Sequence, residues 1–210
     1  NETVFQRYEF EYLLTRDQQA RLLAAAGEDL RPDVYSHSSI RNLYLDTPDF
    51  RLIRRSLEKP VYKEKLRLRS YGRTDRDSPV FMELKKKYRS IVYKRRLTLP
   101  YDRALDCLTG ACPWPETQIG GEIRYTVDFY PDLESRVFLA YERDSWLAPE
   151  SGLRITFDDA IRFRTEELTL DSDPWGTALL GPDQVLMELK APGAIPLWMV
   201  RLLTEMRLYK

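Results

Sequence analysis

Histidine and cysteine are scarce in this chain. Among 210 residues there are one histidine, His37, and two cysteines, Cys107 and Cys112. They cannot supply four ligands to an all-Cys/His zinc site, and a Ser-His-Asp arrangement would need His37 itself. His37 lies in a polar segment, residues 35–39, and is interpreted as a surface residue. The cysteines could form a disulfide, but in a cytosolic protein we expect them to stay free.

The chain also lacks a long apolar run, a glycine-rich phosphate loop and a net charge. No apolar run approaches a membrane span and no signal peptide is recognised, so we expect a soluble, cytoplasmic protein. There is no Walker-type or GxGxxG motif, so side chains would have to bind any phosphate. The 33 Lys and Arg residues are balanced by 33 Asp and Glu residues, which argues against a nucleic-acid-binding protein held by overall positive charge.

What the sequence does contain is a strand-like segment, residues 63–69, with a cation at every second position. Successive side chains of a β-strand point to opposite faces, so Lys63, Lys65, Arg67 and Arg69 should share one face. Four like charges in a row repel one another. One interpretation is an ordinary solvated face, and the other, which we favour, is a surface that binds a polyanion.

Two further basic segments follow. Residues 81–87 place Glu83 and Lys85 on one face, and residues 91–99 do the same with Lys94 and Arg96. The turn-like segments 71–73 and 88–90 separate the three strands, which we therefore predict to be consecutive antiparallel neighbours.

Strands dominate the rest of the predicted secondary structure. Thr15 and Gln18 form a capping-box pair that should begin a helix. The predicted helices are 15–26, 47–58, 102–108 and 196–208. The predicted strands are 5–14, 40–45, 61–70, 80–86, 91–99, 119–129, 137–144, 153–157, 161–164 and 184–190.

The second half repeats the alternation of charged and apolar positions. In 119–129, Glu122 and Arg124 would share a face, and in 184–190, Glu188 and Lys190 would do so. An antiparallel sheet with one solvated face would show this pattern, and so would a closed barrel with charges in its lumen. The segments alone leave both architectures open.

A set of short motifs, taken in order, resembles the VTC domain. This is the polyphosphate polymerase domain of the eukaryotic vacuolar transporter chaperone complex and of bacterial homologues, within the triphosphate tunnel metalloenzymes and related to the CYTH phosphatases. The resemblance covers nearly the whole chain. Its motifs are Arg7-Tyr8-Glu9-Phe10, Tyr12-Leu13-Leu14, Tyr44-Leu45-Asp46-Thr47, Lys65-Leu66-Arg67-Leu68-Arg69, Glu83-Leu84-Lys85, Lys94-Arg95-Arg96, Tyr141-Glu142-Arg143, Arg154-Ile155-Thr156-Phe157-Asp158 and Met187-Glu188-Leu189-Lys190.

The resemblance implies an α+β fold: one domain over residues 1–210, built as a closed antiparallel β-barrel with a charged lumen and helices packed outside. We then expect the charged positions to converge on one lumen. These positions are Lys65, Arg67, Arg69, Glu83, Lys85, Lys94, Arg96, Arg143, Arg154, Glu188 and Lys190.

The resemblance also implies an activity and its residues. The family transfers the γ-phosphate of ATP to a growing polyphosphate chain, with Mn²⁺ or Mg²⁺ as cofactor. The implied catalytic residues are Arg67, Arg69, Lys85, Arg143, Arg154 and Glu188. The implied substrate-binding residues are Lys65, Lys94, Arg96, Tyr141 and Lys190. The implied metal ligands are Glu188, Glu9 and Glu11. The expected partners are ATP and inorganic polyphosphate, with no specific nucleic acid, and a membrane-protein partner outside this chain.

The chain departs from the family pattern at two points. Glu11 stands where the family has a lysine, and Glu9 with Glu11 is similar to the paired glutamates of the related phosphatases. The family also continues beyond a segment like 207–210 into a Ser-Lys-Tyr motif that completes its active site. These departures leave two alternatives to the polymerase: a non-catalytic polyphosphate-binding or regulatory domain, and a metal-dependent tri- or polyphosphatase.

Overall fold

The computed structural model describes residues 8–58, 60–88 and 91–209. The beginning of the predicted first strand, with Arg7, and the turn residues Arg89 and Ser90 lie outside this part. In chain order, the elements are β1 (Tyr8–Thr15), α1 (Arg16–Ala26), the 3₁₀-helix η1 (Gly27–Asp29), β2 (Arg31–Asp46), α2 (Arg51–Leu57), β3 (Tyr62–Tyr71), β4 (Pro79–Tyr88), β5 (Ile91–Pro100), α3 (Tyr101–Thr109), α4 (Gln118–Phe129), β6 (Glu134–Ala148), β7 (Leu153–Arg164), β8 (Thr177–Ala178), β9 (Gln184–Ala191) and α5 (Leu197–Glu205).

The strands form one open antiparallel sheet, and the expected closed barrel is wrong. The strand order is β1-β9-β7-β6-β2-β3-β4-β5, with β8 paired to β7. Within the described residues no pairing joins β5 back to β1. Alternation of apolar and charged residues requires only that one face be covered, and closure needs strand tilt and stagger that alternation does not encode.

The chain divides into two compact units, which are described separately. Unit 1 comprises residues 1–39, 141–161 and 178–210, and unit 2 comprises residues 40–140 and 162–177. Strands β2, β6 and β7 each contribute residues to both units.

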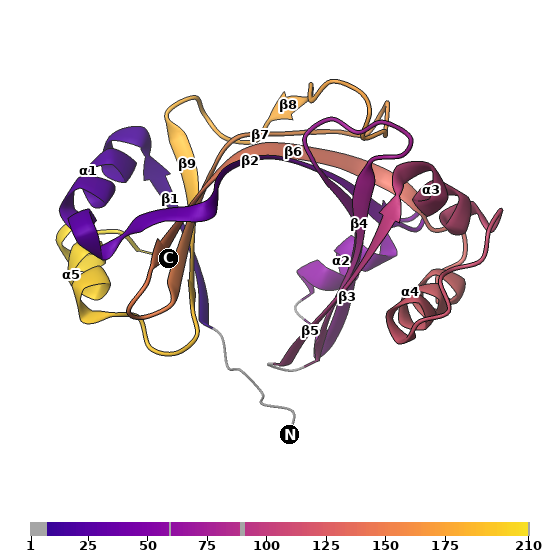
Figure 1. Ribbon diagram of the computed structural model, residues 1–210, viewed down its shortest axis with the longest axis horizontal. Helices are drawn as coiled ribbons and strands as arrows, with labels where there is room; N and C mark the ends of the chain where they lie inside the picture. Colours follow the sequence, from indigo (N-terminus) through magenta and orange to yellow (C-terminus); the bar gives the residue numbers. More distant parts are fainter. Residues whose placement is uncertain (1–7, 59, 89–90, 210) are drawn as a thin grey trace. The chain divides into compact units, whose positions relative to one another are not determined.

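In unit 1, β1 pairs with β9, and β9 pairs with β7. Helices α1 and α5 lie side by side against this part of the sheet (Figure 1). The core consists of alternate strand residues, such as Phe157 and Met187, packed with helix residues such as Leu22 and Met199. The predicted start of α1 is confirmed, because Thr15 and Gln18 form a complete capping box.

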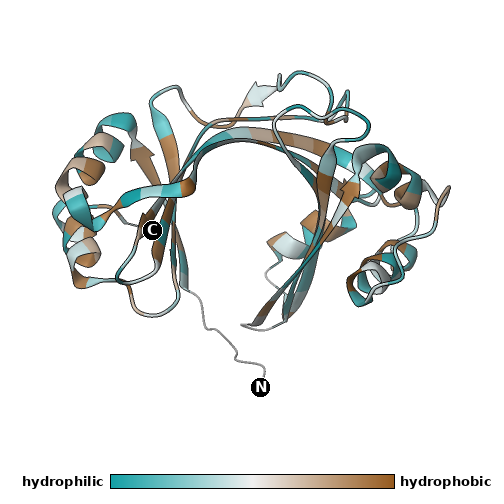
Figure 2. Cartoon of the chain, viewed as in Figure 1, coloured by the Kyte–Doolittle hydropathy of each residue, from teal (hydrophilic) through white to brown (hydrophobic). Residues whose placement is uncertain are grey.

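In unit 2, β3, β4 and β5 are consecutive antiparallel neighbours, as predicted. Helices α3 and α4 lie along one side of these strands (Figure 1). The core beneath them includes Leu66, Leu68, Met82 and Leu84, whose positions alternate with those of the charged residues. The helices carry both hydrophilic and hydrophobic segments (Figure 2), as expected for elements that cover an apolar face.

The prediction of a strand at 119–129 is wrong, because this segment is helix α4. Thr117 caps the helix and accepts a hydrogen bond from the Gly120 backbone N–H at 3.0 Å. The buried positions Gly120, Ile123 and Thr126 recur every three residues, which is a helical repeat. Charged residues at every second position masked this repeat in the sequence.

Helix α2 begins later than predicted, at Arg51 rather than after Thr47. The buried Asp46 carboxylate accepts hydrogen bonds from the backbone N–H groups of Leu52 and Ile53, and the Thr47 hydroxyl accepts one from Arg51. These side chains satisfy the first donors of the helix from outside it, so the turn that contains them precedes the helix.

Several strands extend beyond their predicted limits, among them β2, β6 and β7. Strand β2 begins at Arg31. The sequence did not predict its first half, because these residues are mostly exposed and show no alternation of apolar and polar positions. The two short strands predicted at 153–157 and 161–164 are one strand, β7, in which Ala160 has a φ of 48°.

Candidate functional site: two charged sheet faces

The cations of unit 2 are arranged in rows across β3, β4 and β5. Lys65 is opposite Lys85, and Lys85 is opposite Lys94. In the next row Glu83 lies between Arg67 and Arg96. We call the face formed by these residues, together with Arg69, the basic face. Like charges on directly opposite residues are destabilising, so the row of three lysines favours an anion bound across it.

Glu83 is the central carboxylate of the basic face. It is 2% exposed, and its oxygens contact the Arg67 guanidinium at 2.6 Å, the Arg96 Nε at 2.8 Å and the Lys94 Nζ at 3.2 Å. One buried carboxylate therefore holds three cations in place, and its single negative charge does not neutralise them.

The pKa of Glu83 shows the strength of this positive field. Burial alone would raise the pKa, but the charges of Arg67, Arg69 and Lys94 outweigh it and hold the pKa at about 2. Glu83 is therefore ionised at neutral pH. Burial, together with the charges of Arg96 and Arg67, lowers the pKa of Lys94, and the contact with Glu83 opposes this shift.

Aromatic and amide side chains orient the arginines. The Arg67 guanidinium donates to the Tyr44 hydroxyl at 3.1 Å, and the Arg96 guanidinium lies 4.7 Å from the centre of the Phe81 ring. Arg69 is buried and donates to the Asn42 side-chain oxygen at 2.8 Å. These contacts hold the guanidinium groups in defined positions before any ligand arrives.

The charged face of unit 1 is built from β1, β9 and β7, and we call it the mixed face. Glu9 is opposite Lys190, which is opposite Arg154. In the neighbouring row Glu188 lies between Glu11 and Thr156. Carboxylates and cations thus occur together on this face.

Arg143 on β6 links two carboxylates of the mixed face. Its Nε and one terminal nitrogen donate to the two oxygens of the buried Asp158 at 2.6 and 2.7 Å, a bidentate pair. Its guanidinium also lies 4.0 Å from a Glu188 oxygen and 5.2 Å from the centre of the Tyr141 ring. Glu188 in turn contacts the Lys190 Nζ at 3.1 Å.

Arg154 has a different environment from the other cations. Its guanidinium pairs with Asp33 on β2, and its side chain is 59% exposed. Burial would raise the pKa of Asp33, but the hydrogen bonds from Arg154 and the Val34 backbone lower it.

The donor set for a divalent metal is small. Within residues 8–58, 60–88 and 91–209, no group of three or more His, Cys, Asp or Glu residues could hold a metal ion. The row Glu11–Glu188–Thr156 does offer oxygen donors, the type that hard divalent cations prefer. The buried Thr156 hydroxyl has no hydrogen-bond partner among the described residues. These residues fit a metal that keeps water and substrate phosphates in its coordination shell.

The structure thus places the predicted site residues on two faces. The basic face holds Lys65, Arg67, Arg69, Lys85, Lys94 and Arg96. Unit 1 holds Glu9, Glu11, Tyr141, Arg143, Arg154, Glu188 and Lys190. The single closed lumen expected for both sets is contradicted by the open sheet.

Sequence reasoning assigned no site role to Asn42, Tyr44 or Asp158. Asn42 and Tyr44 lie directly opposite Arg69 and Arg67 across β2 and β3. Even spacing in β2 could have placed them on one face, but only the register shows which arginine each contacts.

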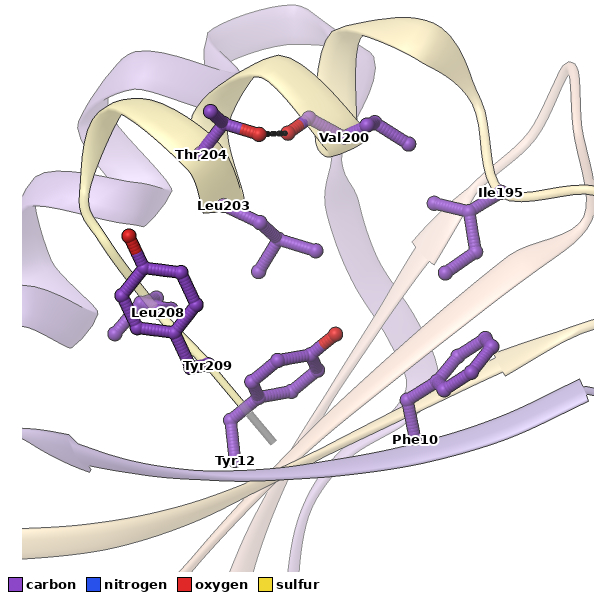
Figure 3. A pocket seen from close by; sticks show the side chains of 8 residues that line it. All are labelled: Phe10, Tyr12, Ile195, Val200, Leu203, Thr204, Leu208 and Tyr209. Carbon is purple, nitrogen blue, oxygen red and sulfur yellow. Dashed lines mark hydrogen bonds between the residues drawn. The ribbon is translucent and has the colours of Figure 1, made fainter.

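An apolar cavity of about 290 Å³ also lies in unit 1. Figure 3 shows that Phe10 and Tyr12 of β1 form one side and residues in and around α5, among them Leu203 and Thr204, the other. Its lining contains no charged side chain, so it does not have the chemistry of a phosphate site.

Comparison with solved structures identifies proteins of similar fold. Two of these solved structures are candidate adenylate cyclases. One is a candidate adenylate cyclase from Bacillus halodurans, with a TM-score of 0.56 and 16% identity, covering 96% of this chain and 91% of that one. The other is a candidate adenylate cyclase from Vibrio parahaemolyticus, with a TM-score of 0.50 and 12% identity, covering 97% of this chain and 86% of that one. At this identity the likeness shows the fold alone.

The family is shown by the sequence. Residues 6–210 match the family model of the VTC domain, and the chain belongs to this family. No curated protein matches the chain. No helix in the described part is long and apolar enough to cross a membrane.

Proposed function

We propose that this chain is an ATP-dependent polyphosphate polymerase. In the proposed reaction, a terminal oxygen of the polyphosphate chain attacks the γ-phosphorus of ATP. The bond from that phosphorus to the bridging oxygen breaks, and ADP leaves with the electron pair. Phosphoryl transfer needs mainly positioning and neutralisation of charge, which a pre-arranged array of cations supplies.

The observation that carries the proposal is the cross-strand order of the basic face. Lys65, Lys85 and Lys94 lie directly opposite one another, and Glu83 offsets only part of the neighbouring arginine charge. A chain of phosphates carries regularly spaced negative charge that matches such rows. The guanidinium groups of Arg67 and Arg96 can each donate two hydrogen bonds to one phosphate.

The proposed metal role belongs to the mixed face. Glu188, with Glu11 and the Thr156 hydroxyl in the same row, would hold Mn²⁺ or Mg²⁺. When bound, the metal would neutralise charge on phosphate oxygens. Lys190 and Arg143 contact Glu188 and orient its carboxylate.

The proposed role of the basic face can be tested by measuring turnover of ATP and binding of tripolyphosphate with the full chain. With ATP and Mn²⁺ the protein should lengthen polyphosphate on a gel and release ADP. Arg67→Ala and Lys85→Ala should each weaken tripolyphosphate binding by about 5- to 150-fold, corresponding to about 1–3 kcal/mol for a charge-assisted hydrogen bond. Arg76→Ala removes the same kind of charge from an exposed loop position beside Asp102 and should change binding little.

The results also separate the alternatives. If ATP gives no chain growth but polyphosphate alone yields orthophosphate, the chain is a phosphatase, and binding without either product indicates a regulatory domain. If both face variants bind tripolyphosphate as well as Arg76→Ala does, the basic face does not bind phosphate.

The test of the metal role uses Glu188→Gln, which keeps the size of the side chain and removes its charge. We expect loss of Mn²⁺ binding in calorimetry and loss of metal-dependent turnover. Metal-free tripolyphosphate binding should be unchanged or tighter, because a negative charge has gone. If metal-free binding instead weakens as much as in Lys85→Ala, Glu188 is a structural partner of Arg143 and Lys190.

A further inference from the structure

Cys107 and Cys112 lie with their sulfur atoms in contact in unit 2. Cys107 is buried near the end of α3, and Cys112 is partly exposed in the loop that follows. Both thiols are free, and their Sγ atoms are 2.9 Å apart. A disulfide bond is about 2.05 Å long, so a small side-chain movement would join them.

The backbone holds the two cysteines in this arrangement. Gly110 ends α3 with a φ of 78°, a left-handed conformation that favours glycine. The chain then turns back, and the backbone N–H groups of Ala111 and Cys112 donate to the Asp106 carbonyl at 2.8 and 3.3 Å. The proximity of the thiols is therefore built into the end of the helix.

The segment after Cys112 is tied to the same core. The Cys107 thiol lies 3.5 Å from the Pro113 carbonyl oxygen, and Trp114 is buried in the core of unit 2. A covalent link at this point would join the end of α3 to the start of the α3–α4 connection.

We propose that Cys107 and Cys112 form a reversible disulfide whose oxidant is a low-molecular-weight disulfide, R–S–S–R. The Cys112 thiolate attacks one sulfur of the oxidant, the R–S–S–R bond breaks, and one RS⁻ leaves with the electron pair. The Cys107 thiol then loses its proton as its sulfur attacks the Cys112 sulfur of the mixed disulfide, and the second RS⁻ leaves. Two protein thiols are oxidised, the oxidant is reduced to two small thiols, and the two protons pass to the leaving thiolates.

The environments of the two sulfurs set this order. Burial, and then the hydrogen bond with Cys112, raise the pKa of Cys107, while the charge of Arg103 opposes them. Cys107 is therefore a thiol at neutral pH, and access by a small oxidant favours the more exposed Cys112. The closed loop constrains the unfolded chain, so the oxidised protein should melt a few degrees higher.

The experiment treats the folded 210-residue chain with oxidised glutathione. Intact mass and thiol titration should show loss of both thiols, loss of two hydrogen atoms, no retained glutathione, and full reversal by dithiothreitol. Peptide mapping of the oxidised wild-type protein should identify the Cys107–Cys112 disulfide directly.

Two variants test the order of attack. Cys107→Ser should retain one glutathione on Cys112, whereas Cys112→Ser should react at least tenfold more slowly than Cys107→Ser. The proposal is overturned if the wild type keeps both thiols, retains two adducts, or forms disulfide-linked dimers. The proposed order, in which Cys112 attacks first, is overturned if Cys112→Ser takes up glutathione as fast as Cys107→Ser.

Discussion

The two charged faces use carboxylates in different ways. On the basic face, the single buried carboxylate of Glu83 contacts Arg67, Lys94 and Arg96. On the mixed face, Asp158 is paired bidentately with Arg143, and Glu188 contacts Lys190. In the first arrangement three cations share one carboxylate. In the second, carboxylates and cations form local pairs.

This difference indicates what each face can bind. A polyanion gains most where cations are held close together without full compensation, as they are around Glu83. A divalent cation needs carboxylate oxygens, which the row of Glu11 and Glu188 contains. Strands β3–β5 carry the first set of residues, and β1, β9 and β7 carry the second.

We expect the largest loss of stability when the ion pair between Arg143 and Asp158 on the mixed face is broken. Arg143→Ala leaves the buried Asp158 carboxylate without its bidentate partner, and removing one member of a buried pair costs about 3–5 kcal/mol. Urea denaturation should show this loss in the free energy of unfolding. Arg154→Ala, at an exposed pair with Asp33, should cost less than about 1 kcal/mol. Equal losses in the two variants would show that the Arg143 pair is not buried in solution.

We expect an intermediate loss of stability when low pH protonates Glu83 on the basic face. The pKa of Glu83 is about 2 in the folded protein, against about 4.3 for an unperturbed Glu. The stability that comes from its ionisation is therefore present above about pH 4.3 and is lost as pH falls through about 2, a change of about 2–3 kcal/mol.

Glu83→Gln provides the control for this prediction. The variant should be less stable than the wild type at pH 6, and the difference should shrink towards pH 2 because Gln does not titrate. Tripolyphosphate should raise its melting temperature more than that of the wild type, since it supplies the missing negative charge. A constant difference across this pH range would contradict the role given to Glu83.

The smallest effect is at an exposed ion-pair cluster of unit 1. His37 contacts Asp144 at 2.8 Å and Glu142 at 3.2 Å, and the hydrogen bond with Asp144 is the main reason that its pKa is raised. The charged His37 therefore stabilises the folded state fully below about pH 6.5, and this stabilisation is lost as pH rises through the pKa of His37 in the folded protein. Because the side chain is 61% exposed, we expect less than about 1 kcal/mol. Thermal melts of wild type and His37→Gln should differ at pH 6 and coincide at pH 9.

Much of the local structure follows from residue order alone. The capping box at Thr15 and Gln18 marks the start of α1, and Gly110 marks the end of α3, because these signals act through neighbouring backbone groups. Alternation failed at α4, where charges at every second position concealed the helical repeat of Ile123 and Thr126.

By itself the sequence determined which side chains share a face of each strand, because the pleat repeats every two residues. Lys65, Arg67 and Arg69 are an example, and the ordered motifs also determined the family. Only the tertiary structure decided that Glu83 lies between Arg67 and Arg96, that Glu188 lies opposite Glu11, and that the sheet stays open. Register depends on the turns that join the strands as well as on the pattern within each strand. Closure depends on the tilt and stagger of all the strands together, which the pattern of one strand does not specify.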